Sequence, residues 1–212
     1  MYGFFHATVT YLLSGDYSTA NALVDQLEEL ARAKDATLWN GGAKFMRAWI
    51  IAQSRAATNV LSTVSAGMEA WQSANATVWL PKLLSDQASA YADVGQFSEA
   101  WASLAEALGR IETADERWCE AEVNRIAGEV ALQSQQRDVA RAEKYFERAV
   151  ALARQQQAKS WELRAAMSLA RLWRDQGKLQ QARELLAPVY GWFTEGFDTR
   201  DLKEAKALLD EL

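Results

Sequence analysis

The feature that most constrains this 212-residue chain is a small-residue pattern that recurs about every 40 positions. Each copy has a small apolar marker and, four positions later, a larger apolar residue. The markers are Ala20, Val60, Ala100, Ala142 and Ala182, and the larger residues are Val24, Val64, Leu104, Phe146 and Leu186. A spacing of four places both residues on one face of a helix, so the pattern predicts five repeated helical units.

The central copy, residues 84–107, predicts what each unit looks like. Small and apolar residues form one helical stripe before Gly95 and a second stripe after it. Glycine adopts a positive φ at little cost, so Gly95 is expected to be the turn between two paired helices. Alanine at the crossing would let the two backbones approach closely. Equivalent turns are expected at Gly15, Arg55, residues 134–137 and Gly177.

A tryptophan precedes each hairpin after the first: Trp39, Trp79, Trp118 and Trp161. We expect the last three to be mostly buried between neighbouring pairs. The central copy has the order small residue, aromatic residue, glycine, aromatic residue, alanine, larger apolar residue, alanine. This order resembles the tetratricopeptide (TPR) repeat, with a period near 40 instead of 34. The resemblance implies an all-α fold: a right-handed α-α solenoid of about five elongated helix pairs, at residues 1–35, 38–74, 78–113, 117–157 and 160–195. A capping helix over residues 199–211, with Asp198 or Thr199 as its N-cap, would close the end.

Three C-terminal segments, residues 117–132, 153–173 and 185–212, carry a more specific resemblance. They include the run GWFTEGFDTRDLKEAKALL and are similar to the C-terminal repeats of large bacterial proteins that join a class III adenylate or guanylate cyclase domain to a signalling ATPase domain. The resemblance implies a non-catalytic protein–protein interaction and regulatory module of a bacterial signalling protein. A tryptophan ahead of the first hairpin would lie before Met1, so we expect the chain to be part of a longer protein.

Composition favours the same fold class. Half of the residues are hydrophobic, only two are proline, and no stretch shows strand-like alternation, which indicates a single all-α domain. There is one cysteine and no run of 18 apolar residues, so we expect a soluble cytoplasmic protein without a membrane segment. The net charge is −5. Residues 137–183 are basic, which fits either a solvated helix face or a docking surface for an acidic partner; the acidic remainder argues against nucleic acid.

Catalytic chemistry finds little support in the sequence. His6 is the only histidine, so a histidine-based triad or metal cluster would depend on it alone. Cys119 has acidic neighbours, which disfavour a reactive thiolate. The run 41–44, Gly-Gly-Ala-Lys, lacks the spacing and the following hydroxyl residue of a phosphate-binding loop. We therefore expect neither an enzyme nor a cofactor or metal site.

The TPR resemblance implies that the first helix of each pair lines a concave face. Besides Tyr2, Phe5, His6 and Lys82, the partner-binding candidates on that face are Phe45, Trp49, Asp86, Ser89, Arg125, Glu129, Arg164, Arg171 and Arg174. This implies a groove that is aromatic at its N-terminal end and basic at its C-terminal end, suited to an acidic protein or peptide.

Three alternatives remain open at this point. Phe45 and Trp49 are equally well explained as core between repeats. The concave face could instead bind a small-molecule effector. The chain could also self-associate through its first repeat, where Tyr2, Phe4 and Phe5 are expected to be exposed.

Overall fold

The computed structural model describes residues 1–54 and 59–212, and within these ranges the chain is all-α, without a strand. One of its helices, η1, is a single 3₁₀ turn. The helices are α1 (Tyr2–Ser14), α2 (Tyr17–Ala33), α3 (Thr37–Ser54), α4 (Val60–Ser73), α5 (Leu80–Asp93), α6 (Phe97–Ala114), η1 (Arg117–Cys119), α7 (Glu120–Gln133), α8 (Val139–Gln155), α9 (Lys159–Asp175), α10 (Leu179–Tyr190) and α11 (Arg200–Glu211). None of the described helices is both long enough and apolar enough to span a bilayer.

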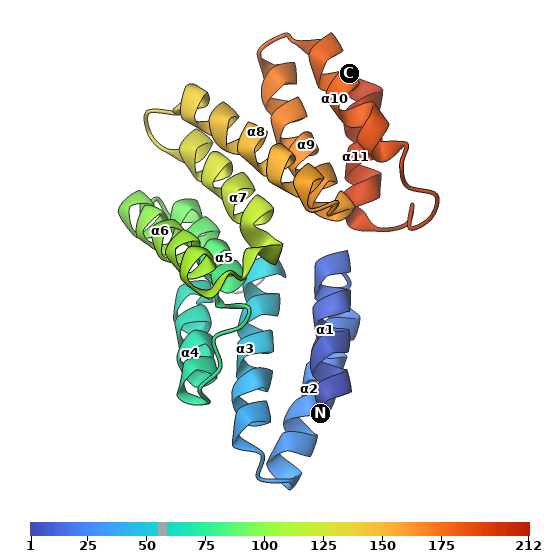
Figure 1. Ribbon diagram of the computed structural model, residues 1–212. Helices are drawn as coiled ribbons and strands as arrows, with labels where there is room; N and C mark the ends of the chain where they lie inside the picture. The colour runs from blue at the N-terminus through green and yellow to red at the C-terminus, as the bar shows by residue number, and fades with distance from the viewer. Residues whose placement is uncertain (55–58) are drawn as a thin grey trace.

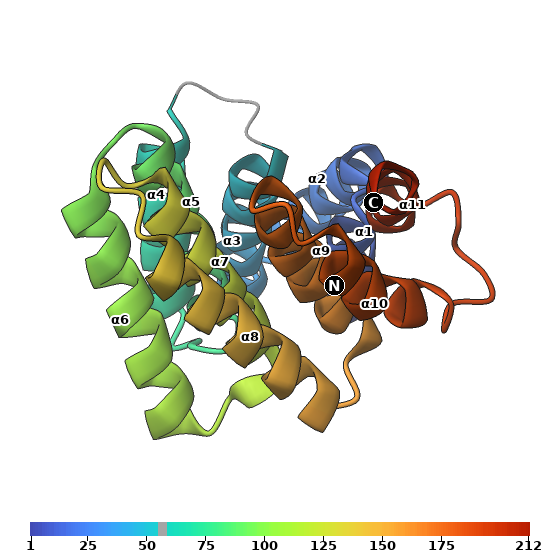
Figure 2. The same ribbon diagram turned by 90° about the horizontal axis from the view of Figure 1, so that it is seen from above.

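Consecutive helices pack as pairs, and the pairs follow one another along the molecule (Figures 1 and 2). Each odd-numbered helix also contacts the next odd-numbered helix, from α1 through to α11. Each even-numbered helix contacts the odd-numbered helices before and after it. The odd-numbered helices therefore form one continuous layer, and the even-numbered helices cover it.

The repeated small residues lie where the sequence pattern predicts. Ala100 is fully buried, as are the other three alanine markers, and the larger residue that follows each marker is buried as well. Val60 is the exception, because it is partly exposed. Of the predicted glycine turns, all three adopt positive φ: 85° at Gly15, 77° at Gly95 and 78° at Gly177. The turn predicted at Arg55 lies outside the described residues.

Three of the four tryptophans ahead of the hairpins form a row of ring contacts that begins at Trp49 of α3, whereas Trp39 contacts the rings of Tyr2 and Phe5. Trp49, Trp79, Trp118 and Trp161 contact one another in succession, with ring centroids 5.9, 4.7 and 6.3 Å apart. The last three are partly buried. Glu116 ties the middle of the row together: its Oε1 accepts from the Trp79 backbone N–H and from the Trp118 ring N–H, both at 2.9 Å. This row joins successive helix pairs along the odd-numbered layer.

At both ends of the chain the structure differs from the sequence-based expectations. Phe5 is buried, not exposed, because its ring stacks on Trp71 at 5.3 Å, whereas Tyr2 is exposed. Thr199 occupies the N-cap position of α11, but its hydroxyl donates to the Gly196 carbonyl and leaves the helix amides uncapped. The stripe of α11 that faces the protein, including Leu202 and Leu208, is buried as its spacing predicts.

Gly128 permits a close approach between α7 and α8. A Cβ built at this position would lie 2.3 Å from a ring carbon of Phe146, whose side chain is fully buried. Gly67 has the same role between α4 and α3, where an added Cβ would lie 2.3 Å from the Cβ of Ala48. At these two crossings the helices come closer than any larger residue would allow.

We predict that Gly128→Ala lowers the free energy of unfolding by about 1–3 kcal/mol, because the added methyl overpacks a buried contact. Gly109→Ala is the matched control, since Gly109 is an exposed interior residue of α6 whose added Cβ would meet nothing within 4 Å. There the same substitution should raise stability by about 0.5–1 kcal/mol through helix propensity. Urea unfolding measures both, and a stabilised Gly128→Ala variant would contradict the observed crossing.

Candidate functional site

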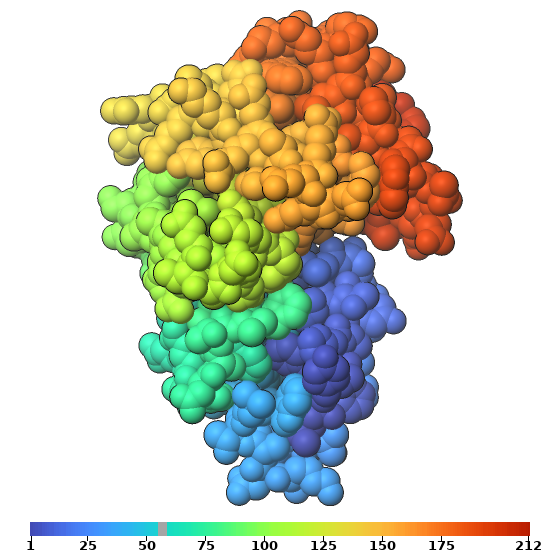
Figure 3. Space-filling model, viewed as in Figure 1, coloured from blue at the N-terminus to red at the C-terminus, as the bar shows by residue number. Residues whose placement is uncertain are grey.

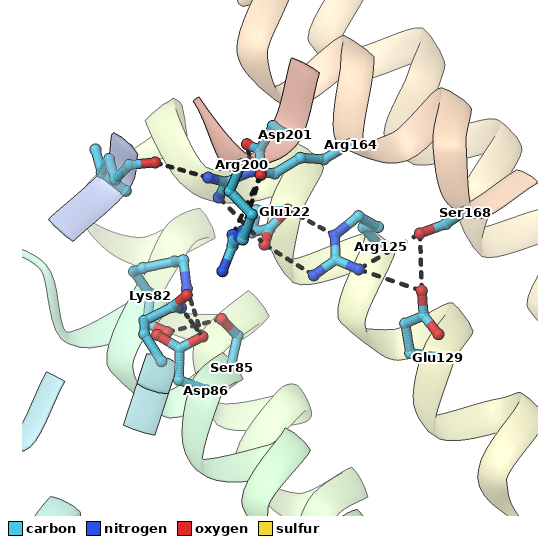
Figure 4. Close-up of polar contacts among 12 residues, drawn as sticks. Lys82, Ser85, Asp86, Glu122, Arg125, Glu129, Arg164, Ser168, Arg200 and Asp201 are labelled. Atoms are coloured by element: carbon cyan, nitrogen blue, oxygen red, sulfur yellow. Dashed lines mark hydrogen bonds and ion pairs between the residues drawn. The ribbon is translucent and has the colours of Figure 1, made fainter. Parts of the chain in front are cut away.

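A polar hollow of about 530 Å³ lies on the layer of odd-numbered helices. Its wall comes from α3, α5, α7, α9 and α11, so every pair except the first contributes side chains. Figure 4 shows the polar contacts at its centre. The charged residues of the wall are Asp86, Glu122, Arg125, Glu129, Arg164, Arg171, Arg200, Asp201 and Glu204.

The centre of the network is a buried ion pair within α7. Arg125 donates to both carboxylate oxygens of Glu122, at 2.8 and 2.9 Å. Burial alone would raise the pKa of Glu122, but the guanidinium of Arg125, with a smaller contribution from Arg164, outweighs it and lowers this pKa to about 2. Glu122 is therefore ionised throughout the physiological range.

Arg125 also reaches the next turn of α7 and the neighbouring α9. Its Nη1 donates to Glu129 at 3.2 Å and to the Ser168 hydroxyl at 3.4 Å. The Ser168 hydroxyl in turn donates to Glu129 at 2.7 Å. A guanidinium whose donors are used in this way holds a fixed orientation, so α7 and α9 present a rigid polar surface to the hollow.

A polar clasp joins the beginning of the chain to its end. Arg164, on α9, donates to Asp201 of α11 and, through Nη2, to the Leu13 carbonyl of α1 at 2.7 Å. Arg200 donates through Nη1 to the Tyr17 hydroxyl of α2 at 2.8 Å. The space-filling view shows the N-terminal residues directly below the C-terminal ones (Figure 3). The first pair therefore meets α9 and α11, and the helix pairs form an arc whose two ends touch.

A second buried ion pair lies at the α5 side of the hollow. Lys82 is fully buried, and its Nζ donates to Asp86 Oδ1, which also accepts from the Gln53 side chain at 2.7 Å. Asp86 is 4% exposed. Its other oxygen, Oδ2, is buried and has no hydrogen-bond partner among the residues that the structure describes. A buried carboxylate oxygen without a donor is unusual, because the group loses its hydration without compensation.

The structure brings six of the nine predicted residues together at the wall of the hollow: Asp86, Ser89, Arg125, Glu129, Arg164 and Arg171. The other three lie elsewhere, which corrects the predicted map. Phe45 and Trp49 are fully buried, so the interpretation of these two as core between repeats is the right one. Arg174 is not part of the wall, and it pairs with Asp175 and Glu211.

The expectation of a basic C-terminal groove is also corrected. Arg125 and Arg164 are ion-paired as described above, and Arg171 donates to Glu204 of α11 at 3.0 Å. Acidic residues of α7 and α11 thus neutralise the arginines that the sequence places on this face. The hollow is charge-dense but nearly balanced.

Several wall residues were missed by the sequence reasoning. Glu122 lies three positions before Arg125, and Ser168 lies between Arg164 and Arg171 at helical spacing, so both could have been added to the same helix faces. Arg200, Asp201 and Glu204 belong to α11, which was interpreted only as a cap. No local signal indicates that their side chains face the hollow.

The remaining reactive residue types lie apart from the hollow. His6 contacts the rings of Tyr2, Phe5 and Trp79. Cys119 is buried, and burial raises the pKa of its thiol to about 12, which disfavours a nucleophilic role. In the described ranges no three His, Cys, Asp or Glu side chains are arranged to hold a metal ion.

Comparison with known proteins returns no match, either to a protein-family model or to a curated protein.

We predict that Arg164→Ala lowers the free energy of unfolding by about 3 kcal/mol or more, because it leaves partly buried Asp201 and the Leu13 carbonyl without their donor. Arg171→Ala is the control on the same helix. Its partner Glu204 is exposed, and exposed ion pairs contribute roughly 0–1 kcal/mol. Equal losses for the two variants in urea unfolding would show that the clasp does not stabilise the fold.

We also predict a pH-dependent contribution from Glu122. Its pKa is lower in the folded chain than the ordinary value of 4.5, so it stabilises the fold above pH 4.5 and loses this contribution as the pH falls toward 2. A shift from 4.5 to 2 corresponds to about 3 kcal/mol. The stability gap between the wild type and Glu122→Gln should therefore narrow between pH 5 and pH 2, measured by denaturant unfolding. A gap that stays constant across this range would contradict the pairing.

Proposed function

We propose that the chain is a non-catalytic regulatory repeat module of the TPR type that binds its ligand in the polar hollow. In this proposal the helix pairs are five repeats of a right-handed solenoid, and α11 is both its cap and part of its binding surface. The 40-residue period and the regular contacts between odd-numbered helices support it. The C-terminal resemblance supports a place in a cytoplasmic bacterial signalling protein with cyclase and ATPase domains.

The observation that carries the proposal is that side chains from five helices converge on one hollow. Of the two ligand classes that the sequence leaves open, the hollow favours a small effector over a protein surface. Its volume of about 530 Å³ lies within the range of pockets that enclose small molecules, roughly 300–1,000 Å³. The clasp between the first and last helices limits the open length of concave surface that an extended peptide would need.

Such a site couples binding to the arrangement of the whole chain. The wall combines residues of α5 and α7 from the middle of the chain with residues of α11 from its end. A ligand that contacts both stabilises the closed arc relative to any opened form, by an amount set by its concentration relative to its dissociation constant. A connected domain that senses the position of α11 would then respond to the ligand.

A protein partner is the second candidate, and a separate surface favours it. Trp192 and Phe197 lie in the segment between α10 and α11 and are 58% and 47% exposed. Large exposed aromatic residues are common anchors in protein interfaces. In this version a protein docks at residues 191–199, away from the polar hollow, and the double variant Trp192→Ser/Phe197→Ser abolishes its binding in a pull-down.

We predict that filling the hollow abolishes ligand binding while the fold persists. Ser89→Trp places a large side chain at the wall, and Ser98→Trp, on the exposed side of α6, is the matched control. A thermal-shift screen of small polar solutes should find stabilisation of the wild type and of Ser98→Trp, but not of Ser89→Trp. The proposal fails if a stabilising solute raises the Tm of all three proteins equally, or if a screen across charged, zwitterionic and neutral solutes stabilises none.

A further inference from the structure

We propose that the ligand of the polar hollow is a small zwitterion, an amino acid or short peptide, whose ammonium group binds Asp86 and whose carboxylate binds Arg171. The inference rests on the proposed function and deepens it by naming the ligand class. It follows from three observations on the wall: an unused acceptor, an arginine with unused donors, and a balance of charge.

The unused acceptor is Asp86 Oδ2. Lys82 and Gln53 both donate to Oδ1, so the charge of Asp86 is held in place from one side while Oδ2 has no donor among the described residues. Because this carboxylate is 96% buried and belongs to the wall, a group that enters the hollow and donates to Asp86 repays part of the desolvation of the carboxylate. An ammonium group does so best, because its hydrogen bond to a carboxylate is assisted by charge.

The arginine with unused donors is Arg171. A guanidinium has five N–H donors, and each of the other wall arginines makes at least two hydrogen bonds: four by Arg125, three by Arg200 and two by Arg164. Arg125 binds Glu122, Glu129 and Ser168, and Arg164 binds Asp201 and the Leu13 carbonyl.

By contrast, Arg171 donates from Nη2 to Glu204 alone among the described residues, and its side chain is 41% exposed. Its planar fork is suited to a carboxylate.

The charge balance excludes a strongly charged ligand. The wall carries four arginines and five carboxylates, and Lys82, directly behind Asp86, supplies the fifth cation. A ligand with a large net charge would leave part of that charge unpaired in a partly desolvated site. A zwitterion adds no net charge and presents one group of each sign, as the two unused groups require.

The test uses the whole chain and a panel of named probes: the twenty free L-amino acids, trialanine, and glucose as a neutral polyol. We expect at least one amino acid, or trialanine, to raise the Tm, and glucose to have no effect. Stabilisation by a free amino acid would indicate a metabolite as the ligand, and stabilisation by trialanine would indicate a peptide. Calorimetric titration of the best probe then gives its affinity.

Two derivatives of the best probe test the contacts without altering the protein. N-acetylation removes the ammonium group and amidation removes the carboxylate. Each should weaken binding by about 10- to 100-fold, the loss of one charge-assisted hydrogen bond. A derivative that binds as tightly as the parent would overturn the contact that it removes.

Variants identify the residues. Arg171→Ala should weaken the parent probe by about 10-fold or more, while barely affecting the amidated derivative, which has no carboxylate to lose. Arg174→Ala, on the same helix but outside the wall, should bind like the wild type. In the Asp86→Asn variant, N-acetylation of the probe should no longer weaken binding, because the contact that it removes is already lost. If its unpaired Lys82 prevents folding, the derivative series on the wild type still decides the role of the ammonium group.

The outcomes separate this inference from the proposed function. If glucose or another non-zwitterion binds and Ser89→Trp abolishes that binding, the hollow is a ligand site but the zwitterion assignment is wrong. If an amino acid binds equally to the wild type and to Ser89→Trp, both are wrong. If no amino acid and no tripeptide stabilises the chain, the zwitterion assignment is overturned, and the wider solute screen decides the proposed function.

Discussion

The close crossing of paired helices is the constraint on which the rest of this structure depends. Small residues at the crossings, Ala100 in the central pair and Gly67 and Gly128 elsewhere, let backbones approach with larger side chains filling the space beside them. Because the same crossing recurs at nearly equal intervals, successive pairs meet their neighbours in similar ways. The result is a continuous layer of odd-numbered helices, and the side chains of the polar hollow come from that layer.

Lining the hollow with charged side chains costs considerable free energy, because these groups lose much of their hydration. The Glu122–Arg125 pair is largely removed from water, and apolar residues of similar volume would often stabilise a fold equally well or better. Stability alone therefore does not account for this network. A wall whose charged side chains are mostly held in place by hydrogen bonds does suit a site that recognises a polar ligand, since the groups need little reorganisation when the ligand enters.

The polar clasp links the stability of the fold to the accessibility of the polar hollow. Arg164 binds both α1 and α11, so closing the arc stabilises the fold and also encloses the hollow. An interaction that holds two ends of a chain together must weaken whenever the ends separate. A ligand that contacts both sides of the wall stabilises the same closed form. Its binding free energy therefore adds to that of the clasp in the equilibrium between the closed and the opened form.

The sequence by itself determined the local structure and much of the site. The spacing of Ala20, Ala100 and their equivalents predicts the helices and their pairing, and Gly15, Gly95 and Gly177 predict the turns, because helical periodicity and positive φ are local properties of the chain. Six wall residues could be predicted because helical spacing gives the residues on one face of a helix, and the TPR resemblance implies which helices line the concave face.

Only the tertiary structure decided which charges meet. The α11 side chains Asp201 and Glu204 turn a predicted basic groove into a balanced one, and Phe45 and Trp49 lie in the core. The contact from Arg164 to Leu13 spans 151 residues of sequence. Such outcomes depend on how small angles between successive pairs accumulate along the chain. A periodic pattern specifies each crossing, but it does not specify where the two ends of the arc arrive.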